Sequence, residues 1–379
     1  MKDMKTRISL LFTSILLAAI ASANDSAYFT SGNQLVPVSE TDISISKEIL
    51  TIGLQDDGNS SITVYYEFFN PGTTDKTILM GFEADPSYND DYEFHADGVH
   101  PHILDFTVEM NGEKLSYKNA VCLAGLPDGI QPLDMSKYEI CEETVTTVRP
   151  VGNDTLFLPF SYVYYFEATF KPGLNKIQHT YKYTNSNGVG FSYEVDYKLT
   201  PATRWANHQI DDFTLIIRAD NTAKHFILDE QDFNMAPWVL TEGEGKQRIT
   251  SYYDSPQREF SLRNGAFSWH KTNYCPKSEL QITSADQIYL FNDNAPFGSF
   301  YDRGSSLEIY YGEQRTEQTM DEKLRRRIAH NLPYAHRGHV FNDPVLKAYF
   351  RALWWYMPNP NYKDSQEDFT DVDRLFIGY

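Results

Sequence analysis

Apolar and polar residues alternate along most of the chain up to about residue 300. In SITVYYEFF, the apolar side chains from Ile62 to Phe68 recur at every second position, which places them on one face of a β-strand. The pattern is shared by ILDFTVEM, FLPFSYVYYFEATF, KIQHTYKY, GFSYEVDYKL, DFTLIIRA and DQIYLF. No helical periodicity longer than about two turns interrupts residues 40–300. Residues 24–311 are therefore predicted to form a mainly β fold of one or two antiparallel β-sandwich lobes.

Turn residues separate these predicted strands. Asn70-Pro71-Gly72 ends one strand, and Asn111-Gly112 is the strongest short signal for a β-hairpin. Lys171-Pro172-Gly173 separates residues 157–170 from residues 176–183. We expect these two runs to pair with each other.

The period changes from two to about four after residue 300. Leu324, Ile328 and Leu332 predict a helix that Pro333 stops. Asp343 and Pro344 have the character of an N-cap and a first helical residue, and they open a second helix that is expected to continue until Pro358 and Pro360 end it. Ser365 is predicted to cap a third helix, with Asp368 in the capping-box position. The sequence therefore predicts a small three-helix C-terminal module at residues 320–379, joined to the β region by a polar linker at residues 312–319.

The N-terminus has the pattern of a signal peptide. Basic residues are followed by the apolar run Ile8 to Ile20 and by the small residues Ala21-Ser22-Ala23. This run is too short to span a bilayer as a helix, which needs about 20 residues. We expect export to remove residues 1–23, no transmembrane segment, and a periplasmic or extracellular location.

Composition narrows the range of partners and cofactors. The chain has 33 Lys and Arg against 52 Asp and Glu, a formal net charge of −19. Such a charge opposes binding to nucleic acid, which requires neutralisation of phosphates. The aromatic content of 15% agrees with a strand-rich protein. No phosphate-binding loop, dinucleotide fingerprint or nucleophile elbow is present, so no cofactor is predicted.

An exported chain meets an oxidising compartment, in which cysteines pair. Cys122 and Cys141 are predicted to form a disulfide that closes a short loop and stabilises the fold by about 3 kcal/mol. The alternative is two buried free thiols. Cys275 has no predicted partner.

Three segments resemble an uncharacterised family of exported, β-rich bacterial proteins. They are residues 24–54, residues 105–112 (DFTVEMNG) and residues 197–217 (YKLTPATRWANHQIDDFTLII). The resemblance implies a β fold and an exported location, and it brings no catalytic residues.

The C-terminal module resembles the YARHG domain, a small extracytoplasmic domain of unknown function. Here the motif reads Tyr334-Ala335-His336-Arg337-Gly338, with the histidine and arginine exchanged. Asn331, Phe341 and the segment DPVLKAYFRALWWYMPNPNY support the match.

The motif has a structural and a functional interpretation. In the first, a left-handed backbone or close packing requires the glycine at Gly338, Arg337 binds helix-terminal carbonyls and stacks on an aromatic ring, and the large aromatics form the core. That core would contain Tyr334, Phe341, Trp354 and Tyr356. In the second, Tyr334, His336, Arg337, His339 and an exposed Trp355 form a binding surface.

A second group of chemically capable residues lies at DYEFHADGVHPH, residues 91–102. His95, His100 and His102, beside Glu93 and Asp97, are ligand types that zinc prefers. They precede a strand without the fixed spacing of a metalloprotease helix, so the alternative is a set of structural loop histidines.

Together these observations predict a non-enzymatic, exported, envelope-associated binding or assembly protein. Its expected partner is cell-wall glycan or peptide, or another envelope protein. The alternative is a metal-dependent hydrolase that uses the His95–His102 loop.

Overall fold

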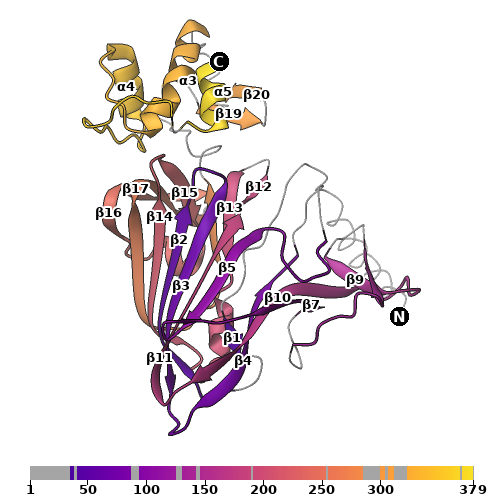
Figure 1. The fold of residues 1–379 in the computed structure, drawn as a ribbon. Helices are drawn as coiled ribbons and strands as arrows, with labels where there is room; N and C mark the ends of the chain where they lie inside the picture. Colours follow the sequence, from indigo (N-terminus) through magenta and orange to yellow (C-terminus); the bar gives the residue numbers. More distant parts are fainter. Residues whose placement is uncertain are drawn as a thin grey trace, which may run out of the picture.

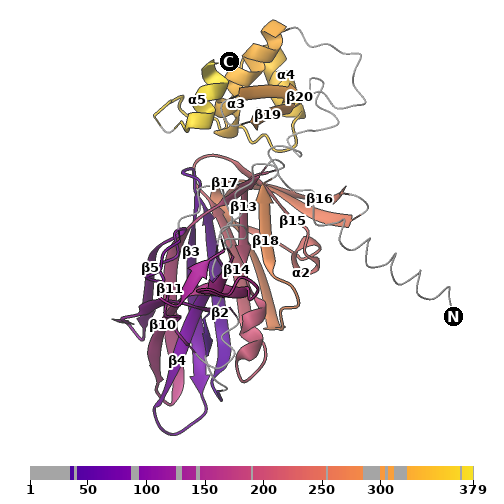
Figure 2. The same ribbon diagram turned by 90° about the vertical axis from the view of Figure 1, so that its right-hand side faces the viewer.

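The computed structural model shows an extended β region with helices at one end (Figures 1 and 2). It describes residues 35–37, 41–86, 94–124, 130–141, 146–188, 191–252, 255–284, 299–303, 306–310, 322–367 and 369–378. The predicted signal peptide (1–23), the predicted linker (312–319) and the run DQIYLF (286–291) lie outside these residues.

The larger of the two main sheets has the strand order β12-β13-β18-β15-β17-β14-β2-β3-β11-β5-β6, and β16 pairs with β17. Neighbours are antiparallel except β2 and β14, which run parallel. Its strands are β2 (Ser44–Leu54), β3 (Asn59–Asn70), β5 (Ile103–Met110), β6 (Glu113–Lys114), β11 (Gly173–Thr184), β12 (Ser186–Gly188), β13 (Phe191–Tyr197), β14 (Ile210–Ala219), β15 (Lys224–Leu228), β16 (Val239–Tyr252), β17 (Ser255–Tyr274) and β18 (Leu280–Ser284).

The smaller sheet has the order β1-β4-β10-β9-β8, and β7 also pairs with β10. Its strands are β1 (Val36–Pro37), β4 (Lys76–Ala84), β7 (Lys118–Leu123), β8 (Tyr138–Ile140), β9 (Thr147–Pro150) and β10 (Leu158–Phe170). Two short helices, η1 (Thr200–Arg204) and α2 (Gln231–Asn234), connect strands of the larger sheet.

The predicted alternation is visible in the burial of each strand. In β3, Ile62, Val64, Tyr66 and Phe68 are all buried. Most buried apolar side chains of the two sheets form one continuous hydrophobic cluster. The mainly β prediction is therefore confirmed, and the two sheets share a single core.

The chain crosses between the sheets at two adjacent corners. β3 ends at Asn70 in the larger sheet and β4 follows in the smaller one, whereas β10 returns to the larger sheet as β11. Asn70 Nδ2 donates to the carbonyls of Thr74 and Phe170, at 3.1 and 3.0 Å, which ties the corners together. The predicted pairing of residues 157–170 with 176–183 is wrong, because the turn at 171–173 changes sheet. The Asn111-Gly112 hairpin is confirmed by the pairing of β5 with β6.

The C-terminal region contains three helices, α3 (Glu322–His336), α4 (Pro344–Ala352) and α5 (Asp371–Gly378), with the hairpin β19 (Ser299–Arg303) and β20 (Ser306–Tyr310) beside them (Figure 1). Their buried side chains form a separate hydrophobic cluster. No helix among the described residues is long and apolar enough to cross a membrane.

Three of the predicted helix ends are wrong. Pro333 lies inside α3 and does not stop it. The helix ends instead at His336, where Gly338 has a φ of 90° and donates its N–H to the Ala335 carbonyl at 3.0 Å. The third helix begins after Thr370, whose hydroxyl and N–H both bind the Asp373 carboxylate. The Ser365 hydroxyl accepts from the Glu367 N–H at 3.2 Å, six residues before the helix begins. The second helix, α4, ends at Ala352 and does not continue to Pro358. By contrast, Asp343 caps α4 as predicted, accepting from the N–H groups of Val345 and Leu346 at 3.0 Å each.

The predicted disulfide is not part of this structure. Cys122 and Cys141 are both buried and both free thiols. Cys122 lies in β7, where it packs with Ala120 and Val163, and Cys141 follows β8. Burial raises the pKa of the Cys122 thiol to about 11. Spacing along the chain could not reveal that the two residues follow different strand pairings.

Candidate functional site

One side of β17 is polar and yet buried. Glu259, Ser261 and Arg263 occupy alternate positions and are at most 4% exposed. Phe260 and Leu262, between them, face the core of the β region. A polar strand face with so little exposure must be covered by another part of the protein.

Strand register extends this polar face across β15 and β16. His225 of β15 and Lys246 of β16 lie beside Ser261. Along β16, Arg248 lies opposite Glu259, and Glu244 lies opposite Arg263. We call this set the docking face: His225, Glu244, Lys246, Arg248, Glu259, Ser261 and Arg263.

The helical region covers the docking face with backbone carbonyls. Lys246 Nζ donates to the carbonyls of Trp354 and Tyr356, at 3.0 and 2.9 Å. Arg263 donates to the carbonyls of Met357, at 2.7 Å, and His336, at 3.3 Å. Because the last carbonyls of a helix carry partial negative charge, basic side chains are suitable partners for the end of α3.

Gly338 fits closely against the docking face. A Cβ at this position would lie 2.4 Å from Arg263 Nη1, and the positive φ already disfavours other residues. The left-handed glycine predicted from the sequence is confirmed. The alternative reason, close packing, is also present, and only its partner, an arginine about 75 residues earlier in the chain, was not predictable from the motif.

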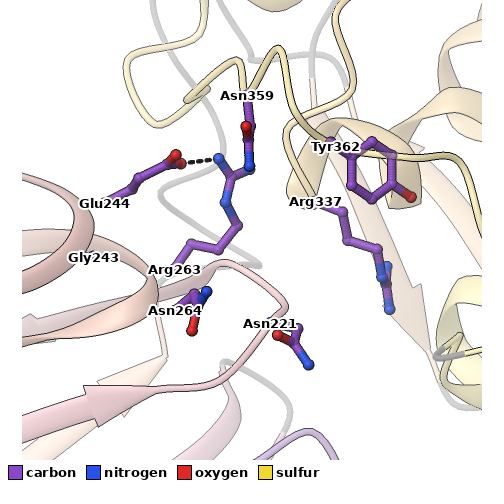
Figure 3. A pocket seen from close by; sticks show the side chains of 8 residues that line it. All are labelled: Asn221, Gly243, Glu244, Arg263, Asn264, Arg337, Asn359 and Tyr362. Carbon is purple, nitrogen blue, oxygen red and sulfur yellow. Dashed lines mark hydrogen bonds and ion pairs between the residues drawn. The ribbon is translucent and has the colours of Figure 1, made fainter.

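A pocket of about 430 Å³ opens between the docking face and the helical region (Figure 3). The β region contributes Asn221 from the β14–β15 loop together with Gly243, Glu244, Arg263 and Asn264, and the helical region contributes Arg337, Asn359 and Tyr362. A bulge shapes one wall: the register shifts between Glu242 and Glu244, and Asn264 opposite has a φ of 45°.

Both arginines of the pocket are already paired with carboxylates. Arg263 forms an ion pair with Glu244, drawn as a dashed line in Figure 3. Arg337 Nη2 binds Asp373 at 2.7 Å, its Nη1 binds the Pro333 carbonyl at 3.0 Å, and its guanidinium lies 4.4 Å from the centre of the Phe369 ring. The predicted helix-end bonding and aromatic stacking of Arg337 are therefore present.

The other four residues of the predicted binding surface form two ring pairs, Tyr334 with His339 at 6.2 Å and His336 with Trp355 at 4.7 Å between ring centres. Tyr334 accepts from Gln366 and packs on Phe369, and His339 bonds to Asp364 at 2.6 Å. His336 and Trp355 lie against the docking face. Trp355 is only 1% exposed, so the prediction of an exposed Trp355 is wrong.

The histidine loop has structural contacts. His100 is fully buried, with Nε2 at 2.9 Å from the Asp85 carbonyl and Nδ1 accepting from the His102 N–H at 3.1 Å. Burial lowers the pKa of His100 to about 3 and that of His102 to about 4. The backbone N–H of His95 donates to Tyr162. Among the residues described, no group of three or more His, Cys, Asp or Glu side chains could hold a metal ion.

The pocket residues of the β region were not identified from the sequence. Asn221, Glu244 and Arg263 lie in three different segments and meet only through the pairing of β15, β16 and β17. The one available signal was the polar run at alternate positions 259, 261 and 263, which is indistinguishable in sequence from a solvent-facing side.

Two family models match parts of the chain. The YARHG domain matches residues 307–378, and a domain of unknown function, DUF4424, matches residues 23–136. Two of the segments noted for their resemblance to an exported family fall within the second match, whereas residues 197–217 lie outside it. No curated protein matches the chain.

Several solved structures match the chain at low identity and with TM-scores below 0.5. One, described as a "putative nutrient binding protein" from Legionella pneumophila, is 18% identical, with 94% of this chain and 98% of that chain covered and a TM-score of 0.48. An M1 zinc metallopeptidase from Deinococcus radiodurans is 11% identical, with 78% and 54% covered and a TM-score of 0.27. Baculovirus P35 is 11% identical, with 66% and 98% covered and a TM-score of 0.25.

Proposed function

The chain carries a DUF4424 domain near its N-terminus and a YARHG domain at its C-terminus, and from this premise we propose that it is an exported, non-enzymatic binding protein of the cell envelope. The pocket between the docking face and the YARHG domain is its ligand site. The observation that carries the proposal is that both parts of the chain contribute to one polar pocket of about 430 Å³.

The lining favours a ligand that is polar and uncharged. Both arginines are neutralised, by Glu244 and by Asp373. The remaining polar groups are the amides of Asn221, Asn264 and Asn359 and the hydroxyl of Tyr362. Amides donate and accept, and a tyrosine ring offers an apolar face, so the set is suited to hydroxyl and acetamido groups.

Such groups occur in cell-wall glycan. Its sugars present hydroxyl and acetamido groups together with apolar ring faces, whereas its peptide stems carry carboxylates, for which the pocket has no uncommitted arginine among the residues described. A soluble glycan fragment is therefore the favoured ligand. The signal-peptide pattern of residues 1–23 supports the location that this ligand requires.

Isothermal titration of the chain with N,N′-diacetylchitobiose and with a cell-wall stem peptide tests the proposal. We expect the sugar to bind and Asn221→Ala to weaken its binding by about tenfold, the usual effect of one lost hydrogen bond. Asn342→Ala, an exposed asparagine outside the pocket, is the matched control. Tighter binding of the peptide would mean that the ligand of the pocket is a peptide and not a glycan. If the sugar binds and neither Asn221→Ala nor Tyr362→Ala changes its affinity, the sugar binds outside the pocket and the pocket is not the ligand site.

A further inference from the structure

Three aromatic rings meet where the YARHG domain contacts the docking face. The His225 ring of β15 lies 5.3 Å from the His336 ring at the end of α3 and 5.0 Å from the Trp355 ring that follows α4, measured between ring centres. The His336 and Trp355 rings are 4.7 Å apart. We call these residues the latch cluster, because each contact of His225 joins the two parts of the chain.

Polar atoms in the latch cluster are buried without partners among the described residues. They are both ring nitrogens of His225, Nε2 of His336 and Nε1 of Trp355. Buried polar atoms without hydrogen bonds weaken a contact, because water would satisfy them once the surfaces separate. The cluster therefore holds the YARHG domain less firmly than an apolar contact of the same size.

Cations face the latch cluster, and three of them are paired with carboxylates. Lys224 pairs with Asp56 at 2.8 Å, Arg263 with Glu244, and Arg337 with Asp373 at 2.7 Å. On β16, Lys246 is bound to carbonyls of the YARHG domain. The buried carboxylate of Glu259, on the same side of β17, is paired with Arg248. A proton on either histidine would therefore add positive charge among positive charges, with no carboxylate hydrogen-bonded to the ring nitrogens of His225 or to His336 Nε2 in the described part of the chain. A bound metal ion is disfavoured for the same reason.

We propose that the latch cluster is an acid-sensitive latch: neutral His225 and His336 hold the YARHG domain on the docking face, and their protonation releases it. On release both rings reach water, where a histidine takes up a proton at ordinary acidity. The walls of the pocket separate in the same movement, so acid would also release a ligand. That last consequence rests on the proposed function, whereas the latch itself does not.

The titration of the two histidines gives the expected size of the effect. Burial, followed by the neighbouring cations, lowers the pKa of His336 to about 3, and burial together with His336 lowers the pKa of His225. In the released form each histidine has an ordinary pKa of 6.5. At pH values well below 6.5, each histidine therefore shifts the equilibrium between the docked and the released YARHG domain toward release by about tenfold per pH unit. Two histidines together give about a hundredfold per unit.

Amide hydrogen exchange of the full chain tests the latch. The Ala223 N–H donates to the His336 carbonyl across the contact, so its protection reports release. After correction for intrinsic exchange, we expect its protection to fall by about a hundredfold between pH 5.5 and 4.5, while amides of the β3–β11 ladder stay protected. His225→Phe should reduce the change to about tenfold, and the double variant His225→Phe/His336→Phe should abolish it.

His270→Gln, an exposed histidine on β17, is the matched control and should behave as the unaltered chain does. If the double variant does not fold, His225→Gln, which is neutral at every pH, replaces it, with the tenfold expectation of the single change. Protection of Ala223 that does not vary with pH overturns the latch, and so does a double variant that keeps the original pH dependence. Ligand titration at pH 7.5 is measured separately, because its failure would contradict the proposed function and leave the latch unaffected.

Discussion

Gly338 is constrained both by its backbone conformation and by the space around it. Its φ of 90° strains any residue with a side chain, and the space where a Cβ would lie is taken by the guanidinium of Arg263. Gly112 has nearly the same φ, 88°, with nothing within 4 Å of its missing Cβ. A substitution at Gly112 therefore measures the conformational cost of a side chain at positive φ alone, whereas a substitution at Gly338 adds the cost of the contact with Arg263.

We expect Gly338→Ala to lower the free energy of unfolding by more than Gly112→Ala does. The conformational cost of about 1–2 kcal/mol is common to both, and only Gly338→Ala also displaces Arg263 from the carbonyls of His336 and Met357. Urea unfolding of both variants provides the comparison. Equal losses would mean that Arg263 adapts and that the contact contributes little.

Of the two adjacent tryptophans, Trp355 is the one more deeply buried, although Trp354 also packs against the hydrophobic cluster of the helical region, as predicted. Trp355 is buried against His336 and His225, while Trp354 is half-buried beneath Arg248, 4.4 Å from its ring centre. The sequence assignment extended the helical phase of α4 beyond its end. Because α4 ends at Ala352, positions 353–357 follow no helical phase, and no periodicity could assign their directions.

Truncation of the buried ring should accordingly cost more. We expect Trp355→Ala to destabilise the chain by about 3–5 kcal/mol and Trp354→Ala by less, because the Trp354 ring packs against the same cluster but is only partly buried. Thermal melts of the full chain measure both. The reverse order would contradict the assignment of Trp355 to the buried contact.

At the scale of single elements, α4 shows what capping contributes. Asp343 accepts from two N–H groups of the first turn and also pairs with Arg327 at 2.9 Å. These contacts hold the pKa of Asp343 below its usual range, chiefly through the Leu346 N–H. The helix start was predictable because every interaction that determines it is local.

Two substitutions separate the cap of α4 from the ion pair. Asp343→Ala should lower stability by about 1 kcal/mol more than Asp343→Asn, because asparagine caps as well as aspartate and both variants lose the pair with Arg327. Chemical unfolding followed by circular dichroism gives the difference. Equal losses would mean that the ion pair with Arg327, and not the cap, accounts for the stability that Asp343 contributes.

Strand pairing shows where prediction from the sequence stops. The β5–β6 hairpin was predictable because Asn111-Gly112 determines both the turn and the partner. At Lys171-Pro172-Gly173 the residues indicate a turn but not the sheet that receives the next strand. In the same way, the polar side of β17 is buried only because the YARHG domain covers it, and local patterns do not record that tertiary contact.

For the molecule as a whole, buried titratable groups of two kinds set the response to pH. Burial keeps histidines neutral, with pKa values of about 3 for His100, His179 and His336 and about 4 for His102. Their contribution to stability is therefore complete above pH 6.5 and is lost as the pH falls toward 3. Burial has the opposite consequence for Glu194 and Glu230, whose pKa values rise to about 7 and 8. Their contribution is complete below pH 4.5 and is lost as the pH rises to 8.

We expect the free energy of unfolding to be greatest near pH 6.5. Below this value the histidines dominate, and above it only the two glutamates still titrate among these groups. Urea unfolding at pH 4.5, 6.5 and 8.5 measures the curve, and Glu230→Gln should flatten its alkaline side. A steady rise of stability from pH 4.5 to pH 8.5 would contradict the assignment of the glutamates.

The parallel pairing of β2 with β14 has a consequence for the order in which the chain folds. Ile45 lies beside Ile210, so one edge of β2 stays open until more than 160 further residues have been made. Closing so long a loop is slow, and it leaves an unpaired strand edge exposed in the meantime. The β region therefore completes its larger sheet late. A chain still emerging from the ribosome or crossing a membrane would keep that edge available to a chaperone until β14 arrives.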